Sequence, residues 1–387
     1  MDAQEVKKYA AELLATLTQA SAALTTIQGI EVGFFDRIPV DRTITAEELS
    51  GQMSYDITRV ERWLQFSEKM GTVSKSGNGY MLTLKGALLR QDTPAPDLLG
   101  LYHMVGYFTK AVQHSKDAYR KGVGLDSITE LKIGRDYIPR VASQLSRASA
   151  ACFKRSGVSS GHTILDLGCG DGSVLRETVK TCPGVSATGI DLSAQTLELA
   201  RNKNTELGLQ DQIELRQGDV TDLSGIKDGA FDWVYSVNVI PYLPLHKRDL
   251  FLREMVRISR YGVFFNQVIK NNIATLSVEV MLSTLFSEFS GFFTESEAEA
   301  FIRKVKVKDY TFLPIIQGES RMVVMLTSRN DVPVSRFTGL KDADRNKLAA
   351  ANILTAKDVL VAIPSAIAKL GLDPEAVRTS AIKLLFP

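Results

Sequence analysis

Cysteine is scarce in this sequence, and its few copies lie far apart. Cys152, Cys169 and Cys182 are the three cysteines among 387 residues, and no two of them form a C-x-x-C pair. A disulfide-stapled scaffold or a cysteine-ligated zinc site needs more cysteines or a closer spacing. The sequence therefore predicts neither, and its thiols fit a reducing compartment.

Histidine and unbalanced charge are scarce as well. The four histidines are scattered along the chain, so we expect no metal site built from them. The 46 basic and 44 acidic side chains leave a formal net charge of +2. Charge alone therefore predicts neither a nucleic-acid partner nor a membrane partner.

Long apolar runs are also missing. No stretch reaches 18 uninterrupted apolar residues, the length that a membrane-spanning helix needs. The opening segment, MDAQEVKKYAAELLATLTQ, is charged and lacks the apolar core of a secretory signal. We therefore expect no nucleic-acid partner, no membrane partner and a cytoplasmic location.

The first part of the chain indicates a small helical domain with a hairpin. Thr45 and Glu48 have the spacing of a capping box at a helix start. An amphipathic helix over 57–70 is expected to end at Gly71, and two strand-like runs around a Gly-Asn-Gly turn follow it. Helix, helix and hairpin is the order of a winged helix, so residues 1–97 are predicted to form a winged-helix-like domain.

Further along, a helical stretch leads into regular strand–helix alternation. Residues 98–157 form a predicted helical bridge. Residues 158–330 alternate short apolar strands with helices and close with a strand pair, which predicts a mostly parallel sheet. Residues 331–387 follow as a helical extension. We expect two or three short helices there, broken at Pro364 and Pro374 and packed against the body or a partner.

The most informative segment is the loop Asp166-Leu-Gly168-Cys-Gly170-Asp-Gly172, between a strand and a helix. Such a turn lets a ligand approach the backbone and the helix N-terminus. A dinucleotide pyrophosphate prefers G-x-G-x-x-G, but the third position here is Ser173. Asp166 would repel a pyrophosphate, whereas it can support a cationic amino-acid group. The loop therefore favours S-adenosylmethionine (SAM) over NAD.

Two further acidic residues follow successive strands. Asp191 ends the second strand, 21 residues after Gly170, where a carboxylate can accept from both ribose hydroxyls. Asp219 follows the third strand, where it can accept from the adenine amine while Val220 packs on the ring. Each acid alone is as well explained by a turn cap. Three such features in register across successive β–α units point to a cofactor site.

These motifs make residues of about 160–329 resemble the class I SAM-dependent methyltransferases. The matching segments are DLGCGDG, GIDLS, GDV and FDWVYSVNVI. The resemblance implies an α/β fold with a Rossmann-like seven-stranded methyltransferase sheet, whose seventh strand runs antiparallel. It also implies cofactor contacts at Leu192, Ser236 and Asn238.

Residues of about 15–92 are similar to the winged-helix dimerisation domain of small-molecule O-methyltransferases. The matching segments are GFFDRI, TAEEL, RVERWLQFSEKMG and YMLTLKGALL. This resemblance implies an N-terminal, mainly helical winged-helix-like domain, a homodimer and a small-molecule methyl acceptor, as in small-molecule biosynthesis. It also implies that the bridge over 98–157 lines the acceptor pocket.

The general base of the resembled O-methyltransferases is missing. Methyl transfer from a sulfonium is an SN2 displacement, in which the alignment of nucleophile, methyl carbon and sulfur matters most. The family usually adds a His base after the fourth strand, but Pro241 occupies that position here. Either the acceptor ionises readily, or proximity suffices, or His246, Tyr242 or His103 takes over. Each of these three also has a plainer explanation, respectively as a solvated loop residue, an aromatic wall and a packed core histidine.

A winged helix also raises an alternative, a SAM-binding regulatory or non-catalytic protein. Helices that recognise DNA carry an excess of basic residues, whereas residues 57–70 mix Arg59, Glu61, Arg62, Glu68 and Lys69. We therefore predict a metal-free, SAM-dependent methyltransferase of a small molecule. The acceptor atom, oxygen, sulfur, nitrogen or carbon, stays open.

Overall fold

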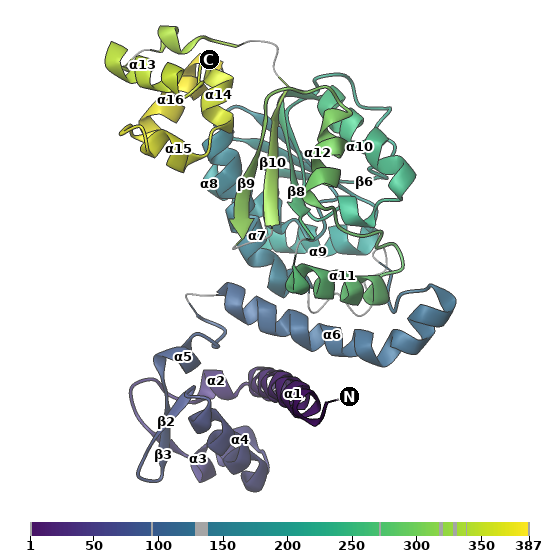
Figure 1. Ribbon diagram of the computed structural model, residues 1–387, viewed down its shortest axis with the longest axis vertical. Helices are drawn as coiled ribbons and strands as arrows, with labels where there is room; N and C mark the ends of the chain where they lie inside the picture. Colours follow the sequence, from purple (N-terminus) through teal and green to yellow (C-terminus); the bar gives the residue numbers. More distant parts are fainter. Residues whose placement is uncertain are drawn as a thin grey trace. The chain divides into compact units, whose positions relative to one another are not determined.

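The computed structural model describes residues 2–93, 96–127, 138–270, 272–316, 320–327, 331–337 and 339–385 (Figure 1). The chain divides into two compact units. The first comprises Met1–Lys110 and Gly134–Ser143, and the second comprises Ala111–Ile133 and Gln144–Pro387. Each unit is described by itself below.

The first unit combines helices with a small antiparallel sheet. In chain order its elements are α1 (Ala3–Glu31), α2 (Phe34–Arg37), β1 (Ile44–Thr45), α3 (Ala46–Met53), α4 (Ile57–Lys69), β2 (Val73–Ser76), β3 (Gly79–Leu82), α5 (Leu84–Ala87) and the start of α6 (Pro96–Lys121). Among the described residues of this unit, three strands pair in the order β1-β3-β2.

Two local sequence signals in this unit are confirmed. Thr45 Oγ1 accepts from the Glu48 backbone N–H at 3.1 Å, and the Glu48 carboxylate accepts from the Thr45 N–H at 2.9 Å. This reciprocal capping box begins α3. Helix α4 ends two residues before Gly71, whose φ of +71° is a left-handed conformation that glycine adopts without strain.

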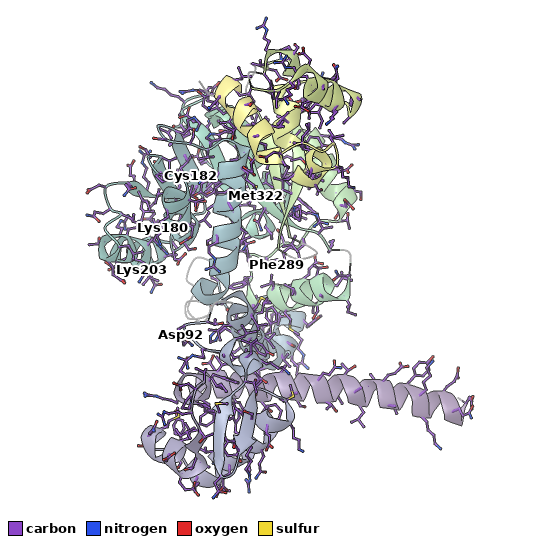
Figure 2. All side chains as sticks on the ribbon, turned by 90° about the vertical axis from the view of Figure 1, so that its left-hand side faces the viewer. Asp92, Lys180, Cys182, Lys203, Phe289 and Met322 are labelled. Atoms are coloured by element: carbon purple, nitrogen blue, oxygen red, sulfur yellow. The ribbon has the colours of Figure 1, made fainter. Side chains whose placement is uncertain are left out.

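Helix α1 carries an apolar seam that the first unit leaves uncovered. Its exposed members recur with an average spacing of 3.5 residues, and they are Val6, Ala10, Leu13, Leu17 and Ala20. Every side chain from 4 to 21 is exposed, and Figure 2 shows this part of the helix extending beyond the rest of its unit. Among the described residues, no helix, α1 included, has the length and apolarity required to cross a membrane.

The second unit is an α/β sandwich. Its elements up to the last strand are the end of α6, the part of α7 (Ile138–Ser156) from Gln144 on, β4 (Thr163–Leu167), α8 (Ser173–Thr181), β5 (Ser186–Asp191), α9 (Ala194–Glu206), β6 (Ile213–Gln217), β7 (Phe231–Ser236), η2 (Ile240–Tyr242), α10 (Leu245–Ile258), β8 (Ser259–Val268), α11 (Ile273–Leu285), α12 (Glu295–Arg303), β9 (Tyr310–Ile316) and β10 (Ser320–Leu326). In the described part of the chain, seven strands are ordered β6-β5-β4-β7-β8-β10-β9, and β10 runs antiparallel to both neighbours. The predicted α/β fold and its antiparallel seventh strand are confirmed.

Two hydrophobic clusters fill the two faces of this sheet. One joins Phe153 of α7, Leu175 of α8 and Trp233 of β7, while the other includes Leu252 of α10 and Phe301 of α12. Neighbouring residues of a strand supply opposite clusters because their side chains point to opposite faces. The helices therefore hold the strand ends in fixed register, and the functional loops emerge from those ends.

The C-terminal extension differs from the prediction in its number of helices. Over the described residues from 331 to 385 it contains η3 (Val334–Arg336), α13 (Asp342–Ala350), α14 (Ala356–Val361), α15 (Pro364–Ala368) and α16 (Pro374–Leu385), which is four α-helices rather than two or three. Pro364 and Pro374 are the first residues of their helices, where a missing N–H costs nothing. The predicted packing against the body is confirmed, because Phe337, Leu360 and Ala381 are fully buried in the cluster that includes Trp233.

Arg378 of α16 fixes this extension to α7. Its side chain is 1% exposed. The guanidinium donates to the carbonyls of Arg155 and Leu360, each at 3.4 Å, and also to the Ala362 carbonyl. Arg155 and Leu360 lie in the last turns of α7 and α14, where carbonyls lack helical partners and the helix dipole is negative. A buried cation is thus neutralised mainly by backbone dipoles.

Candidate cofactor-binding site

The loop between β4 and α8 is built from glycines in left-handed conformations. Gly168, Gly170 and Gly172 have φ values of +79°, +53° and +75°, where other residues are strained. A Cβ atom on Gly168 would also lie 2.3 Å from a methyl group of Val239. The glycines therefore set the path of the loop, and their N–H groups are bonded within the chain to Ile190, Asp191 and Cys169.

Asp191 faces this loop from the end of β5. Its Oδ2 accepts from the Gly170 N–H at 2.8 Å, and its Oδ1 accepts from the Ser193 N–H at 2.9 Å. Burial raises the pKa of the Asp191 carboxyl, and these backbone donors oppose the rise. The structure thus brings Asp191 to the glycine loop, as the sequence predicted.

Asp166, at the carboxyl end of β4, is 1% exposed. Burial is the main reason why its pKa lies well above the usual range, and the nearby charge of Asp191 adds to the shift, while the Tyr235 hydroxyl opposes it. Among the described residues, the Oδ1 atom has no hydrogen-bond partner. An unpaired buried carboxyl oxygen is costly, so this position calls for a donor or a cation from outside the chain.

Arg176 is a site residue that the sequence analysis missed. It lies on α8, and its Nη1 donates to the Asp171 carbonyl at 2.5 Å and to Asn204 Oδ1 at 3.4 Å. Its Nη2 reaches Asp171 Oδ2 at 3.2 Å. The buried guanidinium thus ties the glycine loop to α8 and α9. The sequence around Arg176 gives no sign of this role, because most arginines on helices lie at the surface.

The residues predicted around the adenosine follow β5 and β6. Leu192 is 51% exposed, an unusual setting for leucine, and Val220 is buried. Asp219 is exposed, and its Oδ1 caps a turn by accepting from the Thr221 N–H at 2.8 Å. That bond matches the turn-cap explanation of Asp219. Adjacent parallel strands place Leu192 and Asp219 at the same edge of the sheet.

Ser236 and Asn238 lie at the end of β7 and just beyond it. The Ser236 hydroxyl donates to the Leu167 carbonyl at 2.9 Å, so this side chain links two strand ends. Asn238 has a left-handed φ of +61° and is exposed, and its amide pairs with that of Asn266 in β8. Ser236 therefore contacts the end of β4, and Asn238 contacts β8.

The segment that stands where the resembled O-methyltransferases carry their histidine base is packed against neighbouring aromatic rings. Pro241 and Tyr242 lie in η2, and the Tyr242 ring packs edge-on against Phe286 and Phe289, with centroids 5.6 Å away in both cases. Burial raises the pKa of the Tyr242 phenol, which disfavours the phenolate. This environment supports the aromatic-wall explanation of Tyr242.

The two histidine candidates lie in contrasting places. His246 is exposed in the first turn of α10. His103 belongs to the first unit, where it is 2% exposed and its Nδ1 lies 3.0 Å from Oε1 of Glu31. These settings match the plainer explanations, a solvated residue and a packed core histidine.

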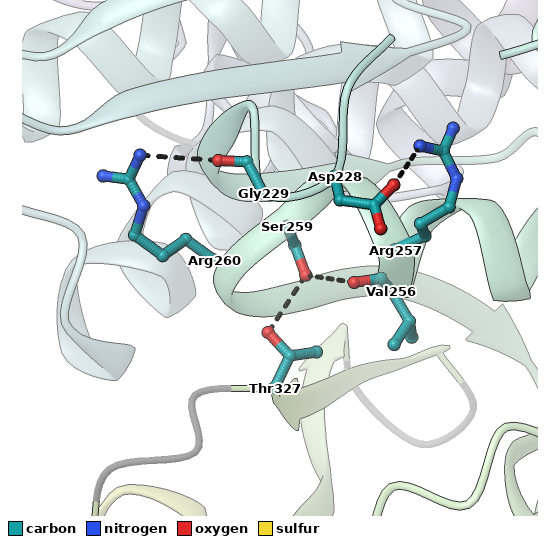
Figure 3. A pocket seen from close by; sticks show the side chains of 7 residues that line it. All are labelled: Asp228, Gly229, Val256, Arg257, Ser259, Arg260 and Thr327. Atoms are coloured by element: carbon teal, nitrogen blue, oxygen red, sulfur yellow. Dashed lines mark hydrogen bonds and ion pairs between the residues drawn. The ribbon is translucent and has the colours of Figure 1, made fainter. Parts of the chain in front are cut away.

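A cavity of about 510 Å³ lies at the other end of the sheet (Figure 3). Its lining residues are Asp228, Gly229, Val256, Arg257, Ser259, Arg260 and Thr327. Asp228 and Arg257 form an ion pair at 2.7 Å, and the hydroxyls of Ser259 and Thr327 lie 3.0 Å apart. Residues 228 and 229 precede β7 and residue 259 begins β8, so this cavity is remote from the carboxyl strand ends that carry Asp166 and Asp191.

Comparison with known proteins shows which proteins the second unit resembles. Residues 164–262 match the family model described as a methyltransferase domain. Methyltransferase GfsG of Streptomyces halstedii is 30% identical over 125 residues, which are 32% of this chain and 44% of that protein. The chain thus spans less than half the length of the curated relatives that it matches.

Solved structures resemble a larger part of the chain. Human N-acetylserotonin methyltransferase in complex with SAM has a TM-score of 0.66 at 15% identity, covering 85% of this chain and 100% of that chain. Mitomycin 7-O-methyltransferase MmcR has a TM-score of 0.64 at 20% identity, covering 84% and 99%.

These matches show what the second unit resembles. Residues 164–262 are similar to methyltransferase domains, and the unit shares its fold with solved methyltransferases, as the sequence resemblance predicted. More narrowly, the fold is that of the O-methyltransferases among the solved structures.

Proposed function

We propose that this protein is a SAM-dependent methyltransferase of a small molecule. The observation that carries the proposal is the unpaired, buried Oδ1 of Asp166 beside a glycine loop held by Asp191. The ammonium group of SAM can pair with the Asp166 carboxyl, and its ribose diol can donate to the Asp191 carboxyl. An ammonium group beside Asp166 would stabilise its carboxylate, whereas the pyrophosphate of a dinucleotide would add a further negative charge to a buried carboxyl.

The residues at the strand ends fit SAM in a consistent order. Asp166 would hold the methionine end, Asp191 the ribose, and Asp219 with Val220 the adenine. Leu192, Ser236 and Asn238 complete the predicted cofactor set, together with Gly168, Gly170 and Gly172 of the loop. Bound SAM supplies an activated methyl group.

The transfer itself requires alignment above all. With SAM bound, a lone pair of the acceptor would attack the methyl carbon while the carbon–sulfur bond breaks with its electrons going to sulfur, S-adenosylhomocysteine would leave, and a proton carried by the acceptor would pass to water. The chain's contribution is to orient the acceptor in line with that bond and to exclude water. Because Pro241 replaces the family's base and Tyr242 has a raised pKa, an acceptor that ionises readily, or proximity alone, explains catalysis best. His246 and His103 are the remaining base candidates.

A homodimer is part of the proposal. The uncovered apolar seam of α1 has the heptad spacing by which helices pair, and a second copy of α1 offers a matching surface. We also assign residues 1–97 as a winged-helix-like dimerisation domain, 98–157 as the bridge to the acceptor pocket, 158–330 as the SAM-binding domain and 331–387 as an extension. The proposed setting is cytoplasmic small-molecule biosynthesis.

Calorimetry and product analysis test this function. We expect SAM and S-adenosylhomocysteine to bind the full-length protein, and S-adenosylhomocysteine to be released when phenols, thiols, amines and carbon acids are screened as acceptors. The regulatory alternative predicts binding without turnover for every acceptor, together with a shift of duplex DNA at low salt. Absence of SAM binding at millimolar concentration would overturn the proposal.

A further inference from the structure

Two asparagines from neighbouring segments form a reciprocal amide pair beside the glycine loop. Asn266 lies in β8 and is 4% exposed. Its Oδ1 accepts from the backbone N–H of Asn238, and its Nδ2 donates to the side-chain oxygen of Asn238 at 2.7 Å. One buried side chain thereby fixes both the main chain and the side chain of the residue that follows β7.

The pair holds a backbone conformation that the loop could not keep easily by itself. Asn238 has a φ of +61°, a region that asparagine tolerates better than most residues but that still costs free energy. The two hydrogen bonds from Asn266 offset that cost. They therefore select one direction for the chain as it leaves β7 and enters η2.

That direction matters because the next residue contacts the glycine loop. Val239 occupies the space that any side chain on Gly168 would need, with its Cγ2 2.3 Å from the position of a Cβ there. Ser236 links the same strand end to the Leu167 carbonyl, one residue before Gly168. A shift of Asn238 would therefore move Val239 against the loop that faces Asp191.

We propose that Asn266 is a positioning residue that holds Asn238 and Val239 in the geometry required for cofactor binding. It acts through Asn238 and does not itself contact the cofactor. This inference rests on the proposed function, because it assigns a role toward the same site. It adds a residue from β8, an element outside every segment that the sequence resemblance used for the cofactor.

The pair is chemically asymmetric, which gives a sharp test. Asn238→Asp keeps an oxygen that accepts from Asn266 Nδ2, so both hydrogen bonds survive. Asn266→Asp keeps the acceptor for the Asn238 N–H, but it replaces the donor with an oxygen that faces the oxygen of Asn238. The double variant N238D/N266D places two carboxylates against each other.

The experiment measures S-adenosylhomocysteine affinity by calorimetry for the wild type and these three full-length variants, with thermal unfolding as a parallel readout. We expect N266D to bind at least about tenfold more weakly than N238D, because N238D keeps both hydrogen bonds of the pair whereas N266D places a buried oxygen against the Asn238 oxygen. The double variant should be weaker than N266D. Equal losses in N238D and N266D, or wild-type affinity in N266D, would overturn the inference.

Asn238→Gly covers the case in which N266D does not fold. Glycine keeps the left-handed backbone and the N–H donor, but it removes the acceptor for Asn266 Nδ2. We expect N238G to bind less tightly than N238D, whereas a purely conformational role of Asn238 predicts N238G to equal or exceed it. A wild-type protein that binds no SAM or S-adenosylhomocysteine contradicts the proposed function itself, which is a distinguishable result.

Discussion

The backbone N–H of Gly170 donates to Oδ2 of Asp191 at 2.8 Å, joining the first β–α turn of the sheet to the end of the second strand. The carboxylate therefore shapes the glycine loop before any ligand binds. Its other oxygen accepts from the Ser193 N–H at the start of α9. A residue predicted as a ribose contact thus also organises the site.

Asp191→Ala should weaken SAM binding by at least about tenfold, because the variant loses the ribose acceptor and leaves the Gly170 N–H unpaired. Calorimetry checks this value. Asp211→Ala, at an exposed carboxylate before β6, is the matched control and should bind as the wild type does. Unchanged affinity in the Asp191 variant would contradict the placement of the cofactor.

Gly168→Ala should destabilise the fold and weaken SAM binding through two separate effects. A left-handed alanine costs roughly 1–2 kcal/mol, and the new methyl group also meets Val239. Gly208 has a similar φ of +67° with open space around it, so Gly208→Ala isolates the conformational cost. Urea unfolding of both variants gives the contribution of the Val239 contact as a difference, and equal losses would show that this contact is unimportant.

Asp166→Asn should change the pH dependence of stability. Because the folded pKa of Asp166 lies above the ordinary value of 3.8, the unfolded chain ionises first as pH rises. Wild-type stability therefore falls from that value up to the folded pKa, and the variant lacks this loss. The stability of Asp166→Asn relative to the wild type should increase in urea unfolding as the pH rises above the ordinary carboxyl pKa of 3.8. A difference that stays constant with pH would contradict the burial argument.

Arg378→Ala should lower the free energy of unfolding by about 2–4 kcal/mol, since three buried carbonyls lose a charged donor. Lys383→Ala, at an exposed position on the same helix, should change it by less than about 0.5 kcal/mol. Below the melting temperature, SAM affinity should be the same in both variants. A similar small effect for both substitutions would show that the extension does not depend on Arg378.

His246→Ala should reduce kcat by no more than about threefold, because an exposed side chain of this kind is a poor candidate for proton removal. Steady-state rates with an identified acceptor provide the measurement. A thousandfold loss of kcat would instead make His246 the general base.

Sequence reasoning predicted the parts of the site that depend on local pattern. The strand, the glycine turn and the helix around Gly168 are contiguous, and Asp191 ends the next strand by the same periodicity. The capping box of Thr45 and Glu48 is equally local. Such features could be predicted because their partners lie within a few residues or recur with the β–α unit.

The missed residues act over long sequence separations. Arg176 reaches Asn204, Asn266 reaches Asn238, and Arg378 reaches Arg155, and in each case the partner lies on another element. No local pattern distinguishes these side chains from solvated ones. The count of helices after residue 331 was wrong for a related reason, because helices as short as α15 gain their stability from packing rather than from propensity.

The bond between Arg378 and Arg155 joins two residues that are 223 positions apart in the sequence. The cluster around Trp233 includes side chains from α7 through α16, so the sheet face formed by earlier residues remains incomplete until the extension docks. The described residues between 331 and 385 thus form one wall of the core of the second unit, and a chain without them would expose the cluster around Trp233 to solvent.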